Sequence, residues 1–262
     1  MTNIIRADIY RILRGKALYI TFALLAVFSL LEVLPHGGGD QIGVNTNAIV
    51  MDFSSQTVDG AVGARLILTV MDNLTYFLIP LFVAVAMSMF SCGAVKNSLS
   101  TGMSRTRLYF SKLALSSLLC VLMMLVYGAV GVLAATALRG PGDWTEPYLL
   151  TLLRAFGAQM VLLLAFNSVG VFLSFSVRNT AAVTGIYIAF ALVPAMVIGL
   201  LVESNGSLAE YYNYDLTMCM KLFSYIEEMS PTEVVRGLAV GIGYIIASTV
   251  AGAALFTRAE IK

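Results

Sequence analysis

Side chains that could carry out covalent chemistry are few in this sequence and lie far apart. The only histidine, His36, is followed by three glycines. The cysteines, Cys92, Cys120 and Cys219, are spaced too widely for a zinc site of the C-x-x-C kind. Cysteines inside apolar segments usually act as small hydrophobic residues. We therefore expect no catalytic residue and no metal site, and a chain that is not an enzyme.

Nucleotide binding is also not expected of this chain. A phosphate-binding loop needs a glycine, any four residues, and then Gly-Lys followed by Ser or Thr. Gly15-Lys16 is the only Gly-Lys pair, and Tyr10 stands where the first glycine of the loop would be. If ATP drives this protein, the ATP and its Mg²⁺ must bind to a separate partner chain.

The composition indicates that most of the chain lies in a membrane. Apolar residues make up 59% of the 262 residues and charged residues 12%, whereas soluble domains average about 45–50% and about 25%. About 20 apolar residues in a helix cross the hydrocarbon, where every backbone polar group needs an internal partner. The sequence has six such runs, at residues 17–34, 74–92, 113–138, 155–175, 181–202 and 237–256. It predicts an all-α polytopic membrane protein, with residues 1–262 forming a single transmembrane domain.

Two of these runs allow more than one interpretation. Run 17–34 follows a basic segment, as a signal peptide would, but Leu34-Pro35-His36 offers no small-x-small cleavage site. We interpret it as a retained first helix. Run 155–175 could begin earlier, with Arg154 extending towards the headgroups.

The interiors of the six runs contain essentially no charged residue, which argues against ion-coupled transport. Gln159 and Asn167 are the strongest polar groups there. They are expected to bond between helices rather than to bind a substrate.

The distribution of Lys and Arg predicts the orientation of the spans. With the N-terminus inside, eleven of these residues fall in inner segments and five in outer segments. The inner set is Arg6, Arg11, Arg14, Lys16, Lys96, Arg105, Arg107, Lys112, Arg178, Arg258 and Lys262, and the outer set is Arg65, Arg139, Arg154, Lys221 and Arg236. Both termini are therefore predicted to be cytoplasmic. The near-neutral net charge of +1 argues against nucleic acid as a partner.

Amphipathic segments are predicted on both sides of the membrane. In residues 1–16, Ile5, Ile9, Ile12 and Leu13 share one helical face and arginines occupy the other, as in a helix that lies on anionic headgroups. The alternative is a positive flank with no fixed structure. Residues 214–229 have the same helical spacing of apolar residues, and they predict an outer helix that ends before Pro231. The other long outer segment begins with glycines and is predicted to start as a flexible loop.

The inner segment 93–112 is longer and more basic than a turn between two helices requires. We interpret it as a docking segment for a partner, although a simple topology anchor would have the same charge. If it docks on a partner, Leu99 is its best apolar anchor, and Lys96 and Arg105 could pair with acidic residues of that partner. Gly102 would let the chain turn back where a Cβ might clash.

This segment carries a resemblance to a known family. It reads G-x-x-K-N-x-L-x-x-G-x-S-R-x-x-x-Y-x-x-K from Gly93 to Lys112, and the chain nears its end in Leu255-Phe256-Thr257-Arg258-Ala259-Glu260-Ile261. Both features resemble the permease subunits of ABC-2-type exporters, in which a second basic residue is common at the position of Ala259. The resemblance implies a multi-pass protein of the bacterial cell membrane. It also implies that Lys96, Asn97, Leu99, Gly102 and Arg105 couple to a cytoplasmic ABC ATPase.

The resemblance further implies a second permease copy or a related permease, with the second and fifth spans beside a translocation path between the two. Permeases of this size often export, or give immunity to, bacterial peptides such as lantibiotics. The candidate path residues are aromatic or flexible side chains suited to a hydrophobic or amphipathic substrate. They are Tyr76, Phe77, Phe82, Met87, Met89, Tyr187, Phe190 and Met196. The alternative is that these residues face lipid or neighbouring helices.

Two further alternatives concern packing and function. Gly237 and Gly241 form a G-x-x-x-G motif that allows close helix packing, unless it faces lipid. For the whole chain, a scaffold or immunity protein that binds a partner without transport is the main alternative to an exporter. A channel is disfavoured because the sequence has no filter-like segment.

Overall fold

The structure is a computed structural model that describes residues 2–33, 59–91, 102–204 and 213–258, together with residues 95, 100 and 211. Nearly all of this described part is helical, and it contains no strand. The predicted all-α fold class is confirmed.

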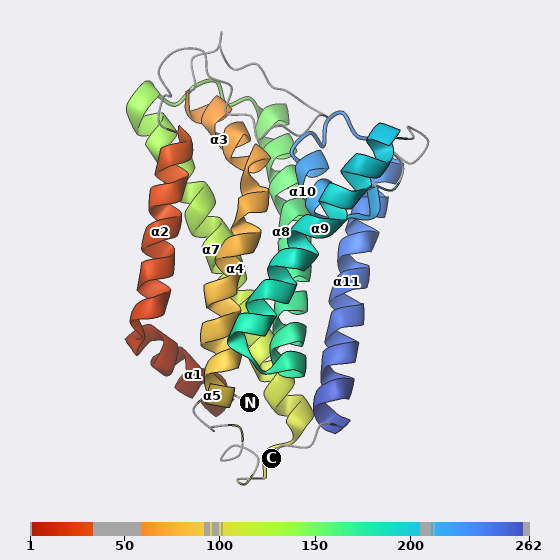
Figure 1. The fold of residues 1–262 in the computed structure, drawn as a ribbon. Helices are drawn as coiled ribbons and strands as arrows, with labels where there is room; N and C mark the ends of the chain where they lie inside the picture. The colour runs from red at the N-terminus through yellow and green to blue at the C-terminus, as the bar shows by residue number, and fades with distance from the viewer. Residues whose placement is uncertain are drawn as a thin grey trace.

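Within the described residues, six helical stretches are long and apolar enough to cross a membrane. They are α2 (Lys16–Val33), the stretch Met71–Phe90, α7 (Arg105–Arg139), α8 (Glu146–Val177), α9 (Thr180–Ser204) and α11 (Pro231–Arg258). Each overlaps one of the six predicted runs, and they lie side by side as a bundle (Figure 1). The chain is therefore a multi-pass membrane protein.

The helices α7 and α8 extend beyond the runs that predicted them. They contain 35 and 32 residues, so each is about 50 Å long against about 30 Å of hydrocarbon. The helix α8 begins at Glu146, nine residues before the predicted run 155–175. The excess length places the first turns of α7 and α8 beyond the hydrocarbon.

The second span is not one regular helix. It consists of η1 (Met71–Asn73), α4 (Leu74–Phe82), the π-helical turn η2 (Val83–Met87) and α5 (Ser88–Ser91). Pro80 lies inside α4, where it cannot donate a hydrogen bond to the preceding turn. A π-turn inside a helix is often found at functional positions. This span is therefore a place where the bundle can bend.

The helix α1 (Thr2–Arg14) confirms that the N-terminal segment is helical. Gly15 separates it from α2, and the two helices meet at an angle at one end of the bundle (Figure 1). Ile12 is buried with Val85 and Leu115, and Ile9 packs against this cluster. The apolar face of α1 thus packs on the protein itself, whereas Leu13 is 49% exposed.

The centre of the bundle is α8, which contacts α3 (Gly60–Thr69), α7, α9, α10 (Leu216–Phe223), α11 and the second span. The most extensive packing is between α8 and α11. The buried positions of α11 are mainly small residues, which let the two backbones approach.

A Cβ added at Gly241 would lie 2.8 Å from Leu162 Cδ2 on α8, and one added at Gly237 would lie 2.7 Å from Phe223 Cζ on α10. Neither position has room for a side chain unless its neighbour moves. Gly241 is thus packed closely against α8, and Gly237 against the short helix α10 rather than another span.

Two short helices fill the end of the bundle opposite α1. The sequence did not predict α3, which begins after the N-cap Asp59 and is almost entirely buried. The predicted outer helix exists as α10 but is shorter than 214–229. It ends at Phe223 because Ser224 N and Tyr225 N bond three residues back, to Lys221 O and Leu222 O, and turns follow. The start of the first outer segment lies outside the described residues.

Candidate functional site

The helices α1, α7 and α11 meet at one end of the bundle, near the described coupling candidates Gly102 and Arg105. Lys112, in the second turn of α7, is 2% exposed, and its Nζ lies 2.6 Å from Asp8 Oδ2 on α1. Arg11 Nη2 lies 3.4 Å from the other oxygen of the same carboxylate. A buried charge needs a partner of opposite charge. The Asp8–Lys112 pair therefore joins α1 to α7, a contact that the sequence analysis did not identify.

Arg105, in the first turn of α7, reaches the end of α11. Its Nη1 donates to Phe256 O at 3.3 Å and to Thr257 O at 3.1 Å. The last carbonyls of a helix have no partner within it and attract positive charge. Arg105 thus caps α11 within this chain. Its predicted pairing with an acidic partner residue stays a prediction.

The turn before α7 contains Gly102, whose φ of +83° is in the region that favours glycine. No atom lies within 4 Å of an added Cβ at this position. Glycine is therefore favoured at this position by its positive φ. The described residues leave room for a Cβ, so the clash expected from the sequence is not the reason. Ser104 then caps α7 by accepting a hydrogen bond from Arg107 N.

The other coupling candidates, Lys96, Asn97 and Leu99, lie outside the described residues. Within the predicted segment, Val95 is described and is only 3% exposed. The described part of the segment is therefore attached to the bundle at Val95, Arg105 and Lys112.

The structure brings several candidate path residues together in the interior of the chain. Phe82 and Tyr187 are fully buried, with their ring centroids 4.9 Å apart. Phe82 also packs over Gly170, where an added Cβ would lie 2.5 Å from the ring. The Tyr187 hydroxyl donates to Thr75 O at 3.0 Å, so this contact ties α9 to the second span. Met87 and Met89 are buried as well.

The remaining path candidates are more accessible. Tyr76, Phe77 and Phe190 are half-buried, and Met196 is 69% exposed on α9. Phe190 packs against Phe166 and Tyr244. Of the eight path candidates, these four are therefore the ones whose side chains are accessible in the described part of the chain.

Gln159 joins three helices at the opposite end of the bundle. It is fully buried on α8, and its Nε2 donates to Leu68 O of α3 and to Met220 O of α10, each at 2.9 Å. Both acceptors are carbonyls in the last turn of a short helix, where capping is needed. The opposite orientation of the amide would place its oxygen against two carbonyl oxygens. Gln159 therefore caps α3 and α10 together.

Asn167 also bonds between helices, as expected. It accepts a hydrogen bond from Ser116 and donates to Ser117 Oγ at 3.3 Å, both on α7. The interhelical role expected of Gln159 and Asn167 is confirmed.

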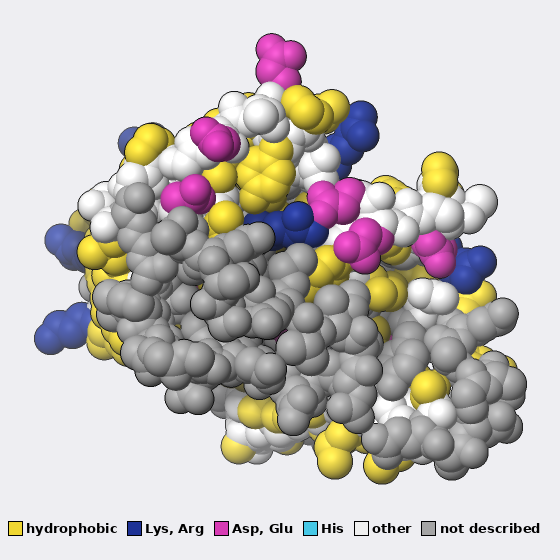
Figure 2. Space-filling view, turned by 90° about the horizontal axis from the view of Figure 1, so that it is seen from above, with side chains coloured by type: hydrophobic (Ala, Val, Ile, Leu, Met, Phe, Trp, Pro, Cys, Tyr) yellow, Lys and Arg dark blue, Asp and Glu magenta, His cyan; other side chains and the backbone are white. Residues whose placement is uncertain are grey.

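Ion pairs reinforce the contact between α3 and α10. Arg65 of α3 pairs with Glu227, just after α10, and Lys221 Nζ of α10 lies 3.6 Å from Asp72 Oδ2 of η1. Seen from this end, Asp and Glu side chains adjoin Lys and Arg beside the grey region (Figure 2). The sequence signal that could have indicated α3 is the apolar, glycine-containing run that follows Asp59.

Burial also affects the titratable groups of α10. Asp215 caps the helix by accepting a hydrogen bond from Met218 N at 2.9 Å. Burial raises the pKa of this carboxyl, and the backbone hydrogen bonds partly oppose that change. Burial likewise raises the pKa of the Cys219 thiol to about 12. The thiol donates to Asn213 O at 3.2 Å, so it is a structural cysteine at neutral pH.

The described residues contain no group of three or more His, Cys, Asp or Glu side chains that could hold a metal ion. Several of their ionisable groups instead bond to helix ends or to one another across helices. Neither a protein-family model nor a curated protein matches the chain.

Proposed function

We propose that this chain is the membrane-spanning subunit of an ATP-driven exporter, with its ATPase on a separate chain and a second permease beside it. The six spans make a membrane transporter possible, and the motif in segment 93–112 resembles that of ABC-2 permeases. The missing phosphate-binding loop fits a subunit that depends on a partner for ATP hydrolysis.

The attachment of the coupling segment is the observation that carries this proposal. The chain leaves the second span, passes through the segment, and enters α7 at residues bonded to both α1 and α11. A displacement of this segment by an ATPase would therefore act on three helices and on the second span. ATP can drive transport only if nucleotide favours one of two arrangements of these helices.

The second span supplies a means for such a change. Pro80 and the π-turn η2 interrupt its regular hydrogen bonding between the interior and the coupling segment. Because Phe82 and Tyr187 close the interior of the chain, we place the substrate path between two permease chains. The substrate would then be hydrophobic or amphipathic, such as a peptide. It would contact the accessible path candidates Tyr76, Phe77, Phe190 and Met196.

The test is purification of the tagged chain from its native membranes in mild detergent, followed by identification of co-purified chains and an assay of Mg-ATP hydrolysis. We expect a chain with a phosphate-binding loop to co-purify. Leu99→Asp should lower its recovery about tenfold or more, because a charge would replace the apolar side chain proposed to dock on the ATPase. Asn179→Asp is the matched control, since Asn179 is exposed at the α1 end and lies outside segment 93–112.

Two results would contradict the proposal. Full recovery of the ATPase with Leu99→Asp, as with Asn179→Asp, would make segment 93–112 a topology anchor only. Absence of any ATPase from the wild-type preparation, with another protein bound instead, would favour a scaffold or immunity protein.

A further inference from the structure

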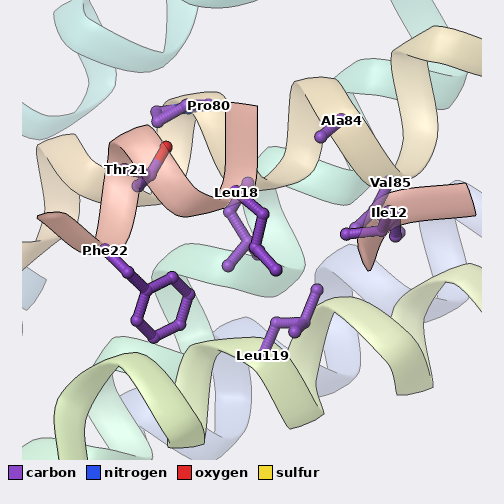
Figure 3. Close-up of a pocket in the computed structure, with 9 residues that line it drawn as sticks. Ile12, Leu18, Thr21, Phe22, Pro80, Ala84, Val85 and Leu119 are labelled. Carbon is purple, nitrogen blue, oxygen red and sulfur yellow. The ribbon is translucent and has the colours of Figure 1, made fainter. Parts of the chain in front are cut away.

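A small apolar pocket lies where α1 meets α2. Its walls come from four parts of the chain: Ile12 of α1, Leu18 and Phe22 of α2, Pro80 and Ala84 of the second span, and Leu119 of α7. Figure 3 shows Leu18 between Phe22 on one side and Ile12 on the other, with Leu119 facing it from α7. We refer to it as the α1–α2 pocket.

The lining of the α1–α2 pocket indicates an apolar occupant. Thr21 is the only lining residue with a polar side chain, and its Oγ1 donates to Ala17 O of its own helix at 2.8 Å. No lining side chain therefore has a free donor for a polar ligand. Several lining residues are half-buried, among them Leu18, Phe22 and Ala84, so the pocket can be reached from the side of the bundle. In a bilayer, the apolar group beside such an opening is an acyl chain.

Exposed basic residues flank the lining residues of the pocket in sequence. Arg14 and Lys16 are exposed on either side of Gly15, and Arg11 is exposed next to Ile12. Lys16 opens α2, so Leu18 to Phe22 lie about 3–9 Å further along the helix axis. The acidic group nearest in sequence is Asp8, whose carboxylate is paired with Lys112. Its other oxygen lies 3.4 Å from Arg11, so Asp8 neutralises little of the positive charge of Arg11, Arg14 and Lys16. Net positive charge thus lies beside a small apolar opening in the side of the bundle.

We propose that the α1–α2 pocket binds an acyl chain of an anionic phospholipid, whose phosphate is held by Arg11, Arg14 and Lys16. Such a site is more specific than the attraction of a basic helix to charged headgroups, because it recognises both the acyl chain and the phosphate of one lipid. It does not depend on the proposed exporter function. The acyl chain contacts Pro80 and Ala84, so its presence bears directly on the bend of the second span.

Brominated lipids provide the test, because bromine quenches tryptophan fluorescence at close contact. The reporter is Phe22→Trp in a Trp144→Phe background, since Trp144 is the only tryptophan of the chain. The protein is reconstituted in phosphatidylcholine vesicles with increasing amounts of dibrominated phosphatidylglycerol. We expect half-maximal quenching at a much lower mole fraction than with dibrominated phosphatidylcholine. Leu118→Trp, exposed to lipid on α7, is the control reporter and should show no such preference.

Two further variants test the parts of the site separately. Each Lys or Arg near an anionic surface strengthens binding about fivefold, so Arg11→Gln with Arg14→Gln and Lys16→Gln should raise the half-quenching mole fraction at least about tenfold. Arg107→Gln with Arg258→Gln removes exposed charge at the same end and should leave it unchanged. Ala84→Phe should fill the pocket and abolish the preference.

Three results would overturn the site. An equal effect of the control charge variant would show attraction to surface charge alone. Equal quenching by the two brominated lipids would show that no headgroup is selected. Unchanged quenching in Ala84→Phe would show that the acyl chain lies elsewhere.

Discussion

At the scale of single residues, the buried side chain of Gln159 joins α8 to α3 and α10 at the end of the bundle opposite α1. Its two N–H groups satisfy carbonyls that are 91 and 61 residues away in sequence. Such bonds contribute about 0.6–1.7 kcal/mol each inside membrane proteins, and an unsatisfied buried carbonyl costs about 1–3 kcal/mol. The effect of Gln159 on stability therefore comes mainly from what its absence would leave unpaired.

We predict that Gln159→Met, which keeps the side-chain length but removes both donors, destabilises the protein by about 1–3 kcal/mol. The measurement is the midpoint of thermal unfolding in detergent. Met160→Leu, a conservative change at the next position of α8, is the control and should have little effect. Equal midpoints for the two variants would mean that α3 and α10 do not depend on this cap.

The cysteine of α10 allows a second prediction at this scale. A thiol with a pKa of about 12 is almost entirely protonated at pH 7.5, and the Cys219 side chain is only 3% exposed. In a Cys92→Ser variant, N-ethylmaleimide should therefore modify neither Cys120 nor Cys219 in the folded protein and both after denaturation. Mass spectrometry gives the number of modified cysteines. Rapid modification of Cys219 in the folded protein would contradict its burial.

At the scale of helices, the packing of α11 on α8 depends on small residues along one side of α11. Gly241→Leu should destabilise the protein by about 1–3 kcal/mol, because the added side chain would overlap Leu162. Gly243→Leu is a matched control two residues away, since no atom lies within 4 Å of a Cβ added there. Thermal unfolding in detergent distinguishes them, and similar midpoints would show that α11 can shift without cost.

The attachment of α1 is a second property of elements, because it depends on a buried ion pair. Removing one member of such a pair costs about 3–5 kcal/mol, whereas replacing both by apolar residues can be nearly neutral. Lys112→Met alone should therefore release α1 and expose it to trypsin, which cleaves after Arg14. Asp8→Leu combined with Lys112→Met should recover much of the protection. Equal cleavage in the wild type and in Lys112→Met would show that the apolar contacts of Ile12 hold α1 by themselves.

At the scale of the whole molecule, the two ends of the bundle differ in charge and in structure. One end combines α1, the start of α7 and the end of α11, with Arg6, Arg14, Lys16, Arg107 and Arg258 exposed. At the other end, Arg65 and Lys221 pair with carboxylates between α3 and α10. The polarity follows the Lys and Arg distribution along the chain, which predicts that the α1 end is cytoplasmic.

Single-cysteine variants of a cysteine-free protein test this orientation in intact cells. We expect an impermeant maleimide to label Asp143→Cys and Glu228→Cys, at exposed positions of the α3–α10 end. Thr106→Cys and Asn179→Cys, exposed at the α1 end, should react only after the membrane is permeabilised. The reverse pattern would place both termini outside.

The sequence by itself determined the features that depend on local composition. Six spans follow from uninterrupted apolar length, because any such stretch must form a helix in hydrocarbon. The helix α1 follows from the alternation of isoleucines with arginines, and the close packing of Gly241 from its spacing with Gly237. The motif of segment 93–112 is likewise visible only as sequence, since Lys96, Asn97 and Leu99 lie outside the described residues.

Only the tertiary structure decided which apolar residues face the interior. Lipid is as apolar as the protein core, so hydropathy cannot distinguish buried Phe82 and Tyr187 from exposed Met196. For the same reason, the short apolar helix α3 could not be recognised as a buried element. The pairing of Lys112 with Asp8 and the capping of α11 by Arg105 join residues 104 and about 150 positions apart. Such pairs form only because the packed helices bring distant polar groups together where water is excluded.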